Sequence, residues 1–161
     1  MTASQSSFAD ASPDQRQEII RDLLERTPKG ILIEGTWRDA SGGETFDVEN
    51  PATGEVLARV TQGTADDVAA AVKAARRAQK GWAALPGTER ARHLYALARH
   101  VQKRERFLSV LETLDNGKPI REARDIDVPL VARHFYHHAG WAELRDTRFP
   151  GHTPLGVCGQ I

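Results

Sequence analysis

Cysteine is nearly absent from this sequence. One cysteine, Cys158, occurs among 161 residues, so the chain cannot form an internal disulfide, and a reducing compartment is the simpler expectation. An excess of charge of either sign is also missing, because 22 Lys and Arg residues balance 22 Asp and Glu residues. A chain without net charge has no overall field to steer it toward nucleic acid or an anionic membrane.

Long apolar runs are missing as well. No stretch approaches the roughly 20 apolar residues that a membrane helix needs, and the polar N-terminus lacks the apolar core of a signal peptide. We therefore expect a cytoplasmic protein. Hydrophobic residues make up 40% and charged residues 27% of the chain, which is typical of one globular domain rather than a disordered segment.

Helix signals begin after a small, polar leading segment. Ser12 suits an N-cap, Pro13 suits the first helical position, and Gln15 completes a capping-box pattern. The apolar period then changes to two over residues 31–63, and turn residues separate the apolar runs. This pattern predicts a short antiparallel β-meander.

The period becomes helical again after this β-region. Thr64 is the expected N-cap of one helix, which Gly81 would end, and Thr88 is the expected N-cap of the next. Gly117 is the expected end of a third helix.

The remaining residues continue the helical pattern before a final apolar stretch. The segment 119–145 predicts two helical pieces, with Asp127 as the cap of the second. Residues 154–161, "PLGVCGQI", are apolar and glycine-spaced and predict a core strand. Strands and helices together predict a mixed α/β fold.

Catalytic side chains are scarce. Cys158 is the only thiol, and no neighbouring cation in the sequence would stabilise its thiolate. We therefore expect a buried small hydrophobic side chain rather than a catalytic nucleophile. No GxGxxG or GxxxxGK[ST] motif occurs to cradle a phosphate.

Two further segments are candidate sites. In "HFYHH", His134 and His138 share a helix face at the spacing of two zinc ligands, but Phe135 replaces the glutamate of HExxH and no third ligand is evident. We interpret it as a histidine-rich interface or core face with stacked or hydrogen-bonded imidazoles, and we predict no metal site. "DNGKP" could present Lys118 to an anion, but we favour a helix stop built from turn formers.

Five motifs occur in order along residues 31–161. They are the turn "NPATGE", the spacing of Trp82, Pro86 and Arg90, and the segments "DNGKP", "AGWA" and "PLGVCGQI". In these motifs and their order the chain resembles the N-terminal part of the NAD(P)-dependent aldehyde dehydrogenases.

The resemblance implies a particular fold and domain division. The fold would be the N-terminal part of the aldehyde dehydrogenase fold: a β-meander, helices and the first strand of a Rossmann-like sheet, incomplete in this chain. Residues 1–27 would form an N-terminal tail and helix, and residues 28–161 would begin the NAD(P)-binding domain. We expect the chain to be the leading part of a much longer enzyme, because the family's catalytic Cys and Glu lie beyond the segment that it resembles.

The resemblance also implies a function. The parent enzyme would oxidise small-molecule aldehydes to carboxylic acids with NAD or NADP, and no catalytic residue falls in this chain. Ile161 resembles the first residue of the segment that runs along the dinucleotide. Leu130 resembles a position at the mouth of the substrate tunnel. The alternative is that Leu130 only packs its helix against a neighbour. The alternative function is a non-catalytic scaffolding or interaction module derived from the same family.

The partners follow from the same resemblance. Most members carry a longer strand pair, used as an oligomerisation arm, where this chain has only "ELRDTRFPGHTP" at residues 143–154. The short segment is similar to that of the long, two-module members. We expect a homo-oligomer in the full-length form and no nucleic-acid or membrane partner. Alone, the chain should be inactive and poorly soluble or partly unfolded.

Overall fold

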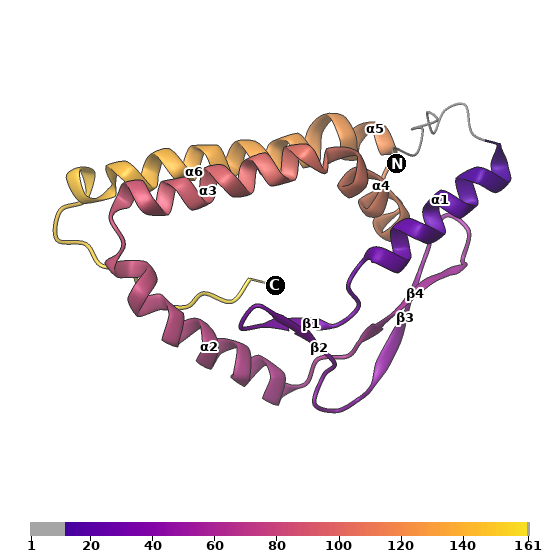
Figure 1. Ribbon diagram of the computed structural model, residues 1–161, viewed down its shortest axis with the longest axis horizontal. Helices are drawn as coiled ribbons and strands as arrows, with labels where there is room; N and C mark the ends of the chain where they lie inside the picture. Colours follow the sequence, from indigo (N-terminus) through magenta and orange to yellow (C-terminus); the bar gives the residue numbers. More distant parts are fainter. Residues whose placement is uncertain (1–11, 161) are drawn as a thin grey trace, which may run out of the picture.

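The helices and strands of this chain lie around the edge of the molecule in the view of Figure 1. The computed structural model describes residues 12–160. Most of the regular structure is helical, and the strands are short. The elements in chain order are α1 (Pro13–Arg26), β1 (Ile31–Ile33), β2 (Thr36–Arg38), β3 (Thr45–Glu49), β4 (Val56–Thr61), α2 (Ala65–Ala84), α3 (Gly87–Lys103), α4 (Glu105–Asn116), α5 (Ile120–Glu122), the π-helix η2 (Ala123–Asp127) and α6 (Val128–Arg148).

Two helix starts follow the predicted capping chemistry. Ser12 caps α1, since its hydroxyl accepts the backbone N–H of Gln15 and the Gln15 side chain accepts the N–H of Ser12. Thr64 caps α2 in the same reciprocal way with Asp67. Each cap satisfies backbone donors that have no partner inside the helix.

The strands form two separate hairpins rather than one meander, so that prediction is wrong. Among residues 12–160, β1 pairs only with β2, and β3 only with β4, both antiparallel. The loop between the hairpins is held at the N-terminus of α2, because the N–H of Ser41 donates to the Asp67 carboxylate at 3.1 Å. This contact joins residues that are 26 positions apart in the sequence.

Two of the predicted helix boundaries are also wrong. Gly81 does not end α2, which continues to Ala84, and Thr88 does not cap α3, which starts at Gly87 after Pro86. A glycine inside a helix costs only about 1 kcal/mol. A proline instead pushes the residue before it into extended backbone, and Leu85 indeed has ψ 142°.

The predicted break at Asp127 takes the form of a π-helical turn. Residues Ala123–Asp127 form η2, and α6 follows it directly. Asp127 keeps helical backbone angles and makes no capping hydrogen bond, so its predicted role as a cap is wrong. Its carboxylate pairs with the ammonium of Lys118 instead.

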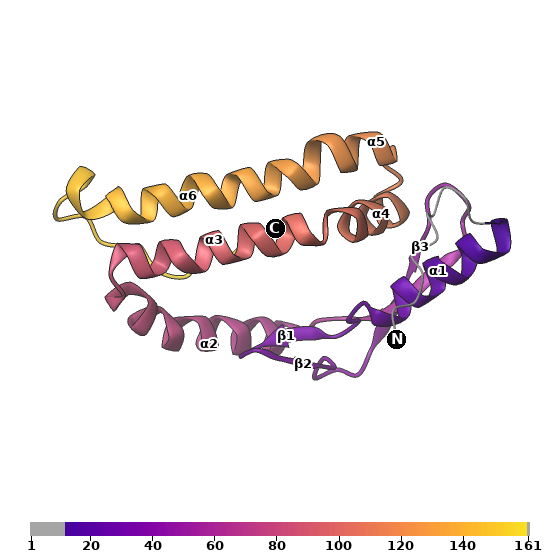
Figure 2. The ribbon, with the colours of Figure 1, turned by 45° about the horizontal axis from the view of Figure 1, so that its top comes forward.

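The best-packed part of the molecule is the seam between α3 and α6. These two helices run antiparallel side by side in both views (Figures 1 and 2). A Cβ added to Gly87 would overlap the carbonyl oxygen of Ala142 and lie 3.2 Å from the Cα of Glu143. Small side chains therefore let the two backbones approach closely, and the buried alanines of the seam are Ala91, Ala98, Ala132 and Ala139.

Away from this seam the described residues bury little. α2 has no buried residue along its whole length. Ser109 is the largest side chain that is fully buried in the described part of the chain. Large apolar side chains are instead exposed, among them Leu32, Trp37, Phe46, Val68 and Trp82.

The segment that follows α6 is extended but is not a strand. Residues 152–160 carry no strand assignment, so the predicted core strand is not found in the described residues. A strand is defined by ladder hydrogen bonds to a neighbour, and no described segment supplies them here. Cys158 is exposed rather than buried, which corrects the expectation for its side chain. No helix among residues 12–160 has the length and apolar character that crossing a membrane requires.

Candidate functional site

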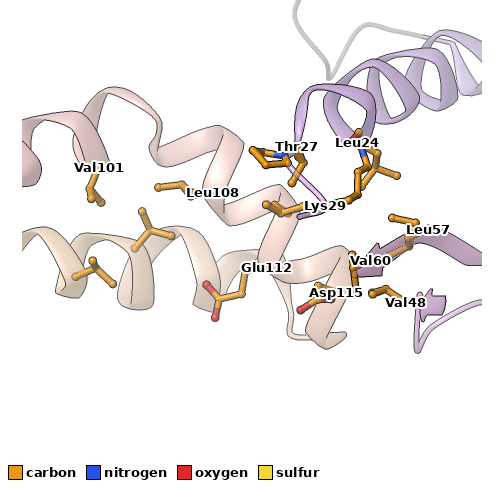
Figure 3. Close-up of a pocket in the computed structure, with 15 residues that line it drawn as sticks. Leu24, Thr27, Lys29, Val48, Leu57, Val60, Val101, Leu108, Glu112 and Asp115 are labelled. Atoms are coloured by element: carbon orange, nitrogen blue, oxygen red, sulfur yellow. Dashed lines mark hydrogen bonds between the residues drawn. The ribbon is translucent and has the colours of Figure 1, made fainter. Parts of the chain in front are cut away.

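An apolar groove lies between α1, the β3–β4 hairpin and the helices α3, α4 and α6 (Figure 3). Its volume is about 630 Å³. We call this feature the apolar groove throughout. Its lining residues are Leu24, Thr27, Pro28, Lys29, Val48, Leu57, Ala58, Val60, Val101, Leu108, Leu111, Glu112, Asp115, Val128 and Val131.

Local sequence patterns place the apolar walls of this groove. On the strand side, Val48 lies directly opposite Ala58 in the hairpin register, so both project to the same face of the sheet. On the helix side, Leu108 and Leu111 are three residues apart on α4, and so lie on one face of that helix.

The charged groups that line the groove are one lysine and two carboxylates. Lys29 closes the C-terminus of α1, where its ammonium contacts the carbonyl oxygen of Leu24 and lies 3.3 Å from that of Glu25. A lysine in this position interacts favourably with the negative end of the helix. Glu112 and Asp115 bring two carboxylates to the opposite wall (Figure 3).

The segment "DNGKP" lies against the turn "NPATGE". Gly117 ends α4 in the left-handed conformation, with φ 78°. A Cβ at this position would lie 2.7 Å from the Cγ of Pro51, so glycine is required both by its backbone angle and by the close approach. Two motifs that are far apart in the sequence therefore meet at one contact.

Lys118 has a carboxylate partner within the chain. Its ammonium pairs with Asp127, and this partner raises the pKa of Lys118 above its ordinary value, with smaller contributions from Glu112 and Glu122. The interpretation of "DNGKP" as a helix stop is confirmed by the left-handed cap at Gly117.

The motif of Trp82, Pro86 and Arg90 lies at the corner between α2 and α3. Arg90 is only 5% exposed, and one end of its guanidinium donates to the carbonyl oxygens of Leu85 and Ala83. These carbonyls belong to the end of α2, where a cation is favoured by the helix dipole. The motif thus has a structural role in holding the α2–α3 corner.

The "HFYHH" segment forms a chain of ring contacts on α6. The Nδ1 of His138 lies 2.8 Å from the carbonyl oxygen of His134, and the indole N–H of Trp141 donates to the Nε2 of His137 at 2.9 Å. Hydrogen-bonded imidazoles are therefore confirmed, but the three histidines are exposed and do not form a core face. Among residues 12–160, no three His, Cys, Asp or Glu side chains are grouped so that they could hold a metal ion.

The structure describes one of the two site residues expected from the resemblance. Leu130 lies on α6 with 41% of its side chain exposed. Its neighbours Val128 and Val131 line the apolar groove, whereas Leu130 is not among the lining residues. Ile161 lies outside the described residues.

Comparison with known proteins gives these features a context. The family model described as "Aldehyde dehydrogenase family" matches residues 37–161. The chain belongs to the aldehyde dehydrogenase family. It is 39% identical over 157 residues to the mitochondrial aldehyde dehydrogenase family 2 member B4 of Arabidopsis thaliana. This match covers 90% of this chain and 29% of the Arabidopsis protein.

The matches to other relatives cover similar shares of each chain. The chain is 36% identical over 163 residues to the mitochondrial aldehyde dehydrogenase of Rattus norvegicus, covering 93% of this chain and 30% of that protein. Betaine aldehyde dehydrogenase from Staphylococcus aureus, solved in complex with NAD+, matches with a TM-score of 0.75 and 31% identity over 79% of this chain and 25% of that one. The chain thus spans about 30% of the length of the curated relatives, in their N-terminal portion.

Proposed function

We propose that this chain is the N-terminal portion of an oxidoreductase that oxidises aldehydes to carboxylic acids with NAD+ or NADP+. The observation that carries the proposal is the family match over residues 37–161. The NAD+ bound in the similar betaine aldehyde dehydrogenase supports a nicotinamide cofactor for the whole protein. By itself, the 161-residue chain is inactive.

The described residues supply positioning surfaces rather than reacting groups. Aldehyde oxidation through a covalent intermediate needs an activated nucleophile and a bound hydride acceptor. The apolar groove presents aliphatic side chains and the carboxylates of Glu112 and Asp115, and the negative charge of these carboxylates does not fit a dinucleotide phosphate. The groove is therefore not the cofactor site.

The finer assignments belong to the same proposal. Residues 1–27 form a tail and helix, and residues 28–161 begin the cofactor-binding domain, in keeping with a family match that starts at residue 37. Ile161 contributes to the dinucleotide site. The exposed side chain of Leu130 contributes to the mouth of the substrate tunnel, and its exposure on α6 leaves it accessible to a substrate.

A chimera tests the proposal most sharply. The N-terminal portion of the rat mitochondrial enzyme is replaced by this chain, and NAD(P)H formation is followed with several aldehydes. We expect activity in the chimera, none in the truncated rat enzyme, and none with the 161-residue chain alone. A chimera that folds and binds NAD+ but oxidises no aldehyde would instead support the alternative, a non-catalytic scaffolding module.

The chimera also tests the assignment of Leu130. Leu130→Trp should raise the KM for bulky aldehydes severalfold and leave the KM for the smallest ones nearly unchanged. The matched control is Val68→Trp, because Val68 is also exposed but lies on α2. Equal effects of Leu130→Trp on small and bulky aldehydes would favour ordinary helix packing at this position.

A further inference from the structure

We propose that His134 and His138 on α6 form a two-histidine binding site for a divalent transition metal ion, and that Cu²⁺ is the ion bound most tightly. The proposal goes beyond the proposed function, because it requires neither an aldehyde nor a nicotinamide cofactor. It also departs from the prediction of no metal site, which rested on the missing third ligand. Hydrogen bonds that the sequence does not show decide which imidazole nitrogens are free to bind a metal.

The two histidines lie on the side of α6 that points away from α3. Ala132 and Ala139 are buried in the α3–α6 seam and mark the packed side of the helix. Successive residues of an α-helix are about 100° apart around its axis, so His134 and His138 fall on the opposite side. Both side chains are exposed, and an ion from solvent can therefore reach them.

The separation of the two rings suits one shared ion. His134 and His138 are four residues apart, which is the spacing at which two histidines on one helix face bind a single metal ion. Their ring centroids are 6.2 Å apart. With metal–nitrogen bonds of about 2.0–2.1 Å, two imidazoles on one ion have centroids no more than about 6.5 Å apart. The observed separation therefore allows one ion to bind both rings.

A hydrogen bond to the backbone fixes the tautomer of His138. Its Nδ1 lies 2.8 Å from the carbonyl oxygen of His134, and because a carbonyl oxygen only accepts, this nitrogen carries the proton. In the neutral ring the free lone pair is then on Nε2, which is left to bind the metal. Histidines that bind metals generally donate their other ring N–H to a carbonyl or carboxylate, which orients the ring.

The neighbouring His137 has no free lone pair to offer. Its Nε2 accepts the indole N–H of Trp141 at 2.9 Å, so the proton of the neutral ring is on Nδ1. Among residues 12–160, in contrast, no hydrogen bond engages the ring nitrogens of His134. The hydrogen bonds therefore select His134 and His138 from the three histidines of "HFYHH".

Two imidazoles determine the kind of ion that binds. Imidazole nitrogen suits Cu²⁺, Ni²⁺ and Zn²⁺, whereas Mg²⁺ and Ca²⁺ prefer oxygen ligands. In the part of the chain that the structure describes, no third His, Cys, Asp or Glu side chain joins these two, so water would fill the other coordination positions. Such a site ranks ions by their intrinsic affinity, in which Cu²⁺ exceeds both Ni²⁺ and Zn²⁺.

Metal titration of the untagged 161-residue chain tests the proposal. Every chain in the test carries Cys158→Ser, because the exposed thiol of Cys158 would itself bind Cu²⁺. We expect isothermal titration calorimetry to show one Cu²⁺ ion per chain, bound more tightly than Ni²⁺ or Zn²⁺. His134→Gln and His138→Gln should each weaken the binding of Cu²⁺ by roughly tenfold or more, because each leaves a single imidazole.

His137→Gln is the matched control. It removes an exposed histidine of the same helix whose Nε2 is already engaged, and it should change the affinity by less than about twofold. Electron paramagnetic resonance of the bound Cu²⁺ provides a second readout. The signal should show coupling to two imidazole nitrogens, and to one after His138→Gln. Far-UV circular dichroism of each variant checks that its helices are intact.

Three outcomes would overturn the proposal. The first is Cu²⁺ binding that is no tighter than that of a variant carrying both His134→Gln and His138→Gln. The others are equal weakening by His137→Gln and coupling of the bound Cu²⁺ to only one imidazole nitrogen. Since no aldehyde or NAD(P)+ enters these measurements, their failure is distinguishable from an inactive chimera.

Discussion

Two apolar regions of this molecule differ in what covers them. Along the α3–α6 seam, small residues on both helices face one another and are fully buried, as at Ala98 and Ala139. In the apolar groove and on α2, larger apolar residues remain partly exposed, as at Val68 with 62% exposure. Both regions have apolar sequence patterns, so the difference lies in whether the chain supplies the opposing surface.

An apolar periodicity therefore predicts which face of a helix is apolar, but it does not predict which element covers that face. α3 and α6 find each other because both belong to this chain and run antiparallel. α2 has an equally helical pattern, begins with a complete capping box and yet buries no residue. Local signals formed this helix, and packing contributes little to holding it in place.

The largest effect should come from breaking the seam. Gly87→Ala places a methyl group into the backbone of α6 at Ala142 and Glu143. Since backbone cannot move aside as a flexible side chain can, we expect a loss of about 3 kcal/mol in the free energy of unfolding. Urea unfolding followed by far-UV circular dichroism measures it.

Gly140→Ala is the matched control for this substitution. Gly140 lies on α6, and a Cβ there would meet no atom within 4 Å. Alanine is the better helix former by about 1 kcal/mol, so this variant should be as stable as the unsubstituted chain or more so. Equal destabilisation by both substitutions would contradict the close packing inferred for the seam.

A smaller effect should come from the corner that joins the two regions. Arg90→Met removes the donor to the partly buried carbonyl groups of Leu85 and Ala83. We expect a loss of about 2 kcal/mol in unfolding free energy, within the range for hydrogen bonds to charged groups. Arg92→Met is the control, because Arg92 is exposed and pairs with Glu89 on the same helix surface, and it should cost less than about 0.5 kcal/mol. Similar costs for the two variants would argue against a capping role for Arg90.

The smallest of these effects should be at the start of α2 and should depend on pH. The backbone N–H of Thr64, and then its hydroxyl and the N–H of Ser41, lower the pKa of Asp67 below its ordinary value, against the opposing effect of burial. A carboxyl with a lowered folded-state pKa stabilises the protein above its unfolded-state pKa of about 3.9, and this contribution is lost as the pH falls through the folded-state value.

Asp67→Asn should therefore destabilise the chain at neutral pH and unfold with a weaker dependence on pH below about 4. Urea midpoints measured between neutral and acidic pH provide the test. Asp66→Asn is the control in the same first turn of α2. If the two variants had identical pH profiles, the hydrogen bonds that Thr64 and Ser41 make to Asp67 would have no energetic role.

Features that depend on neighbouring residues could be predicted from the sequence. Ser12 and Thr64 form the expected caps, and Gly117 ends α4 as expected, because each acts within one turn of helix. The boundary at Gly81 was wrong because the steric effect of Pro86 on Leu85 outweighed the modest cost of a helical glycine.

Features that depend on distant contacts could not be predicted. The apolar groove joins residues such as Leu24, Val60 and Leu111 from three separate segments, and no local pattern indicates that they converge. The loop between the two hairpins also makes a distant contact, between Ser41 and Asp67. The motif at Trp82, Pro86 and Arg90 was visible in the sequence, but its capping role required the position of the α2 carbonyls.

Native-state hydrogen exchange of the isolated 161-residue chain, resolved by peptide, tests the central comparison most directly. We predict that peptides from α3 and α6 exchange slowest and that peptides from α1, α2 and the β3–β4 hairpin exchange at low denaturant, well before the seam opens. Uniform protection of all these elements, lost together in one cooperative transition, would contradict the account and show that the groove side is as well supported as the seam.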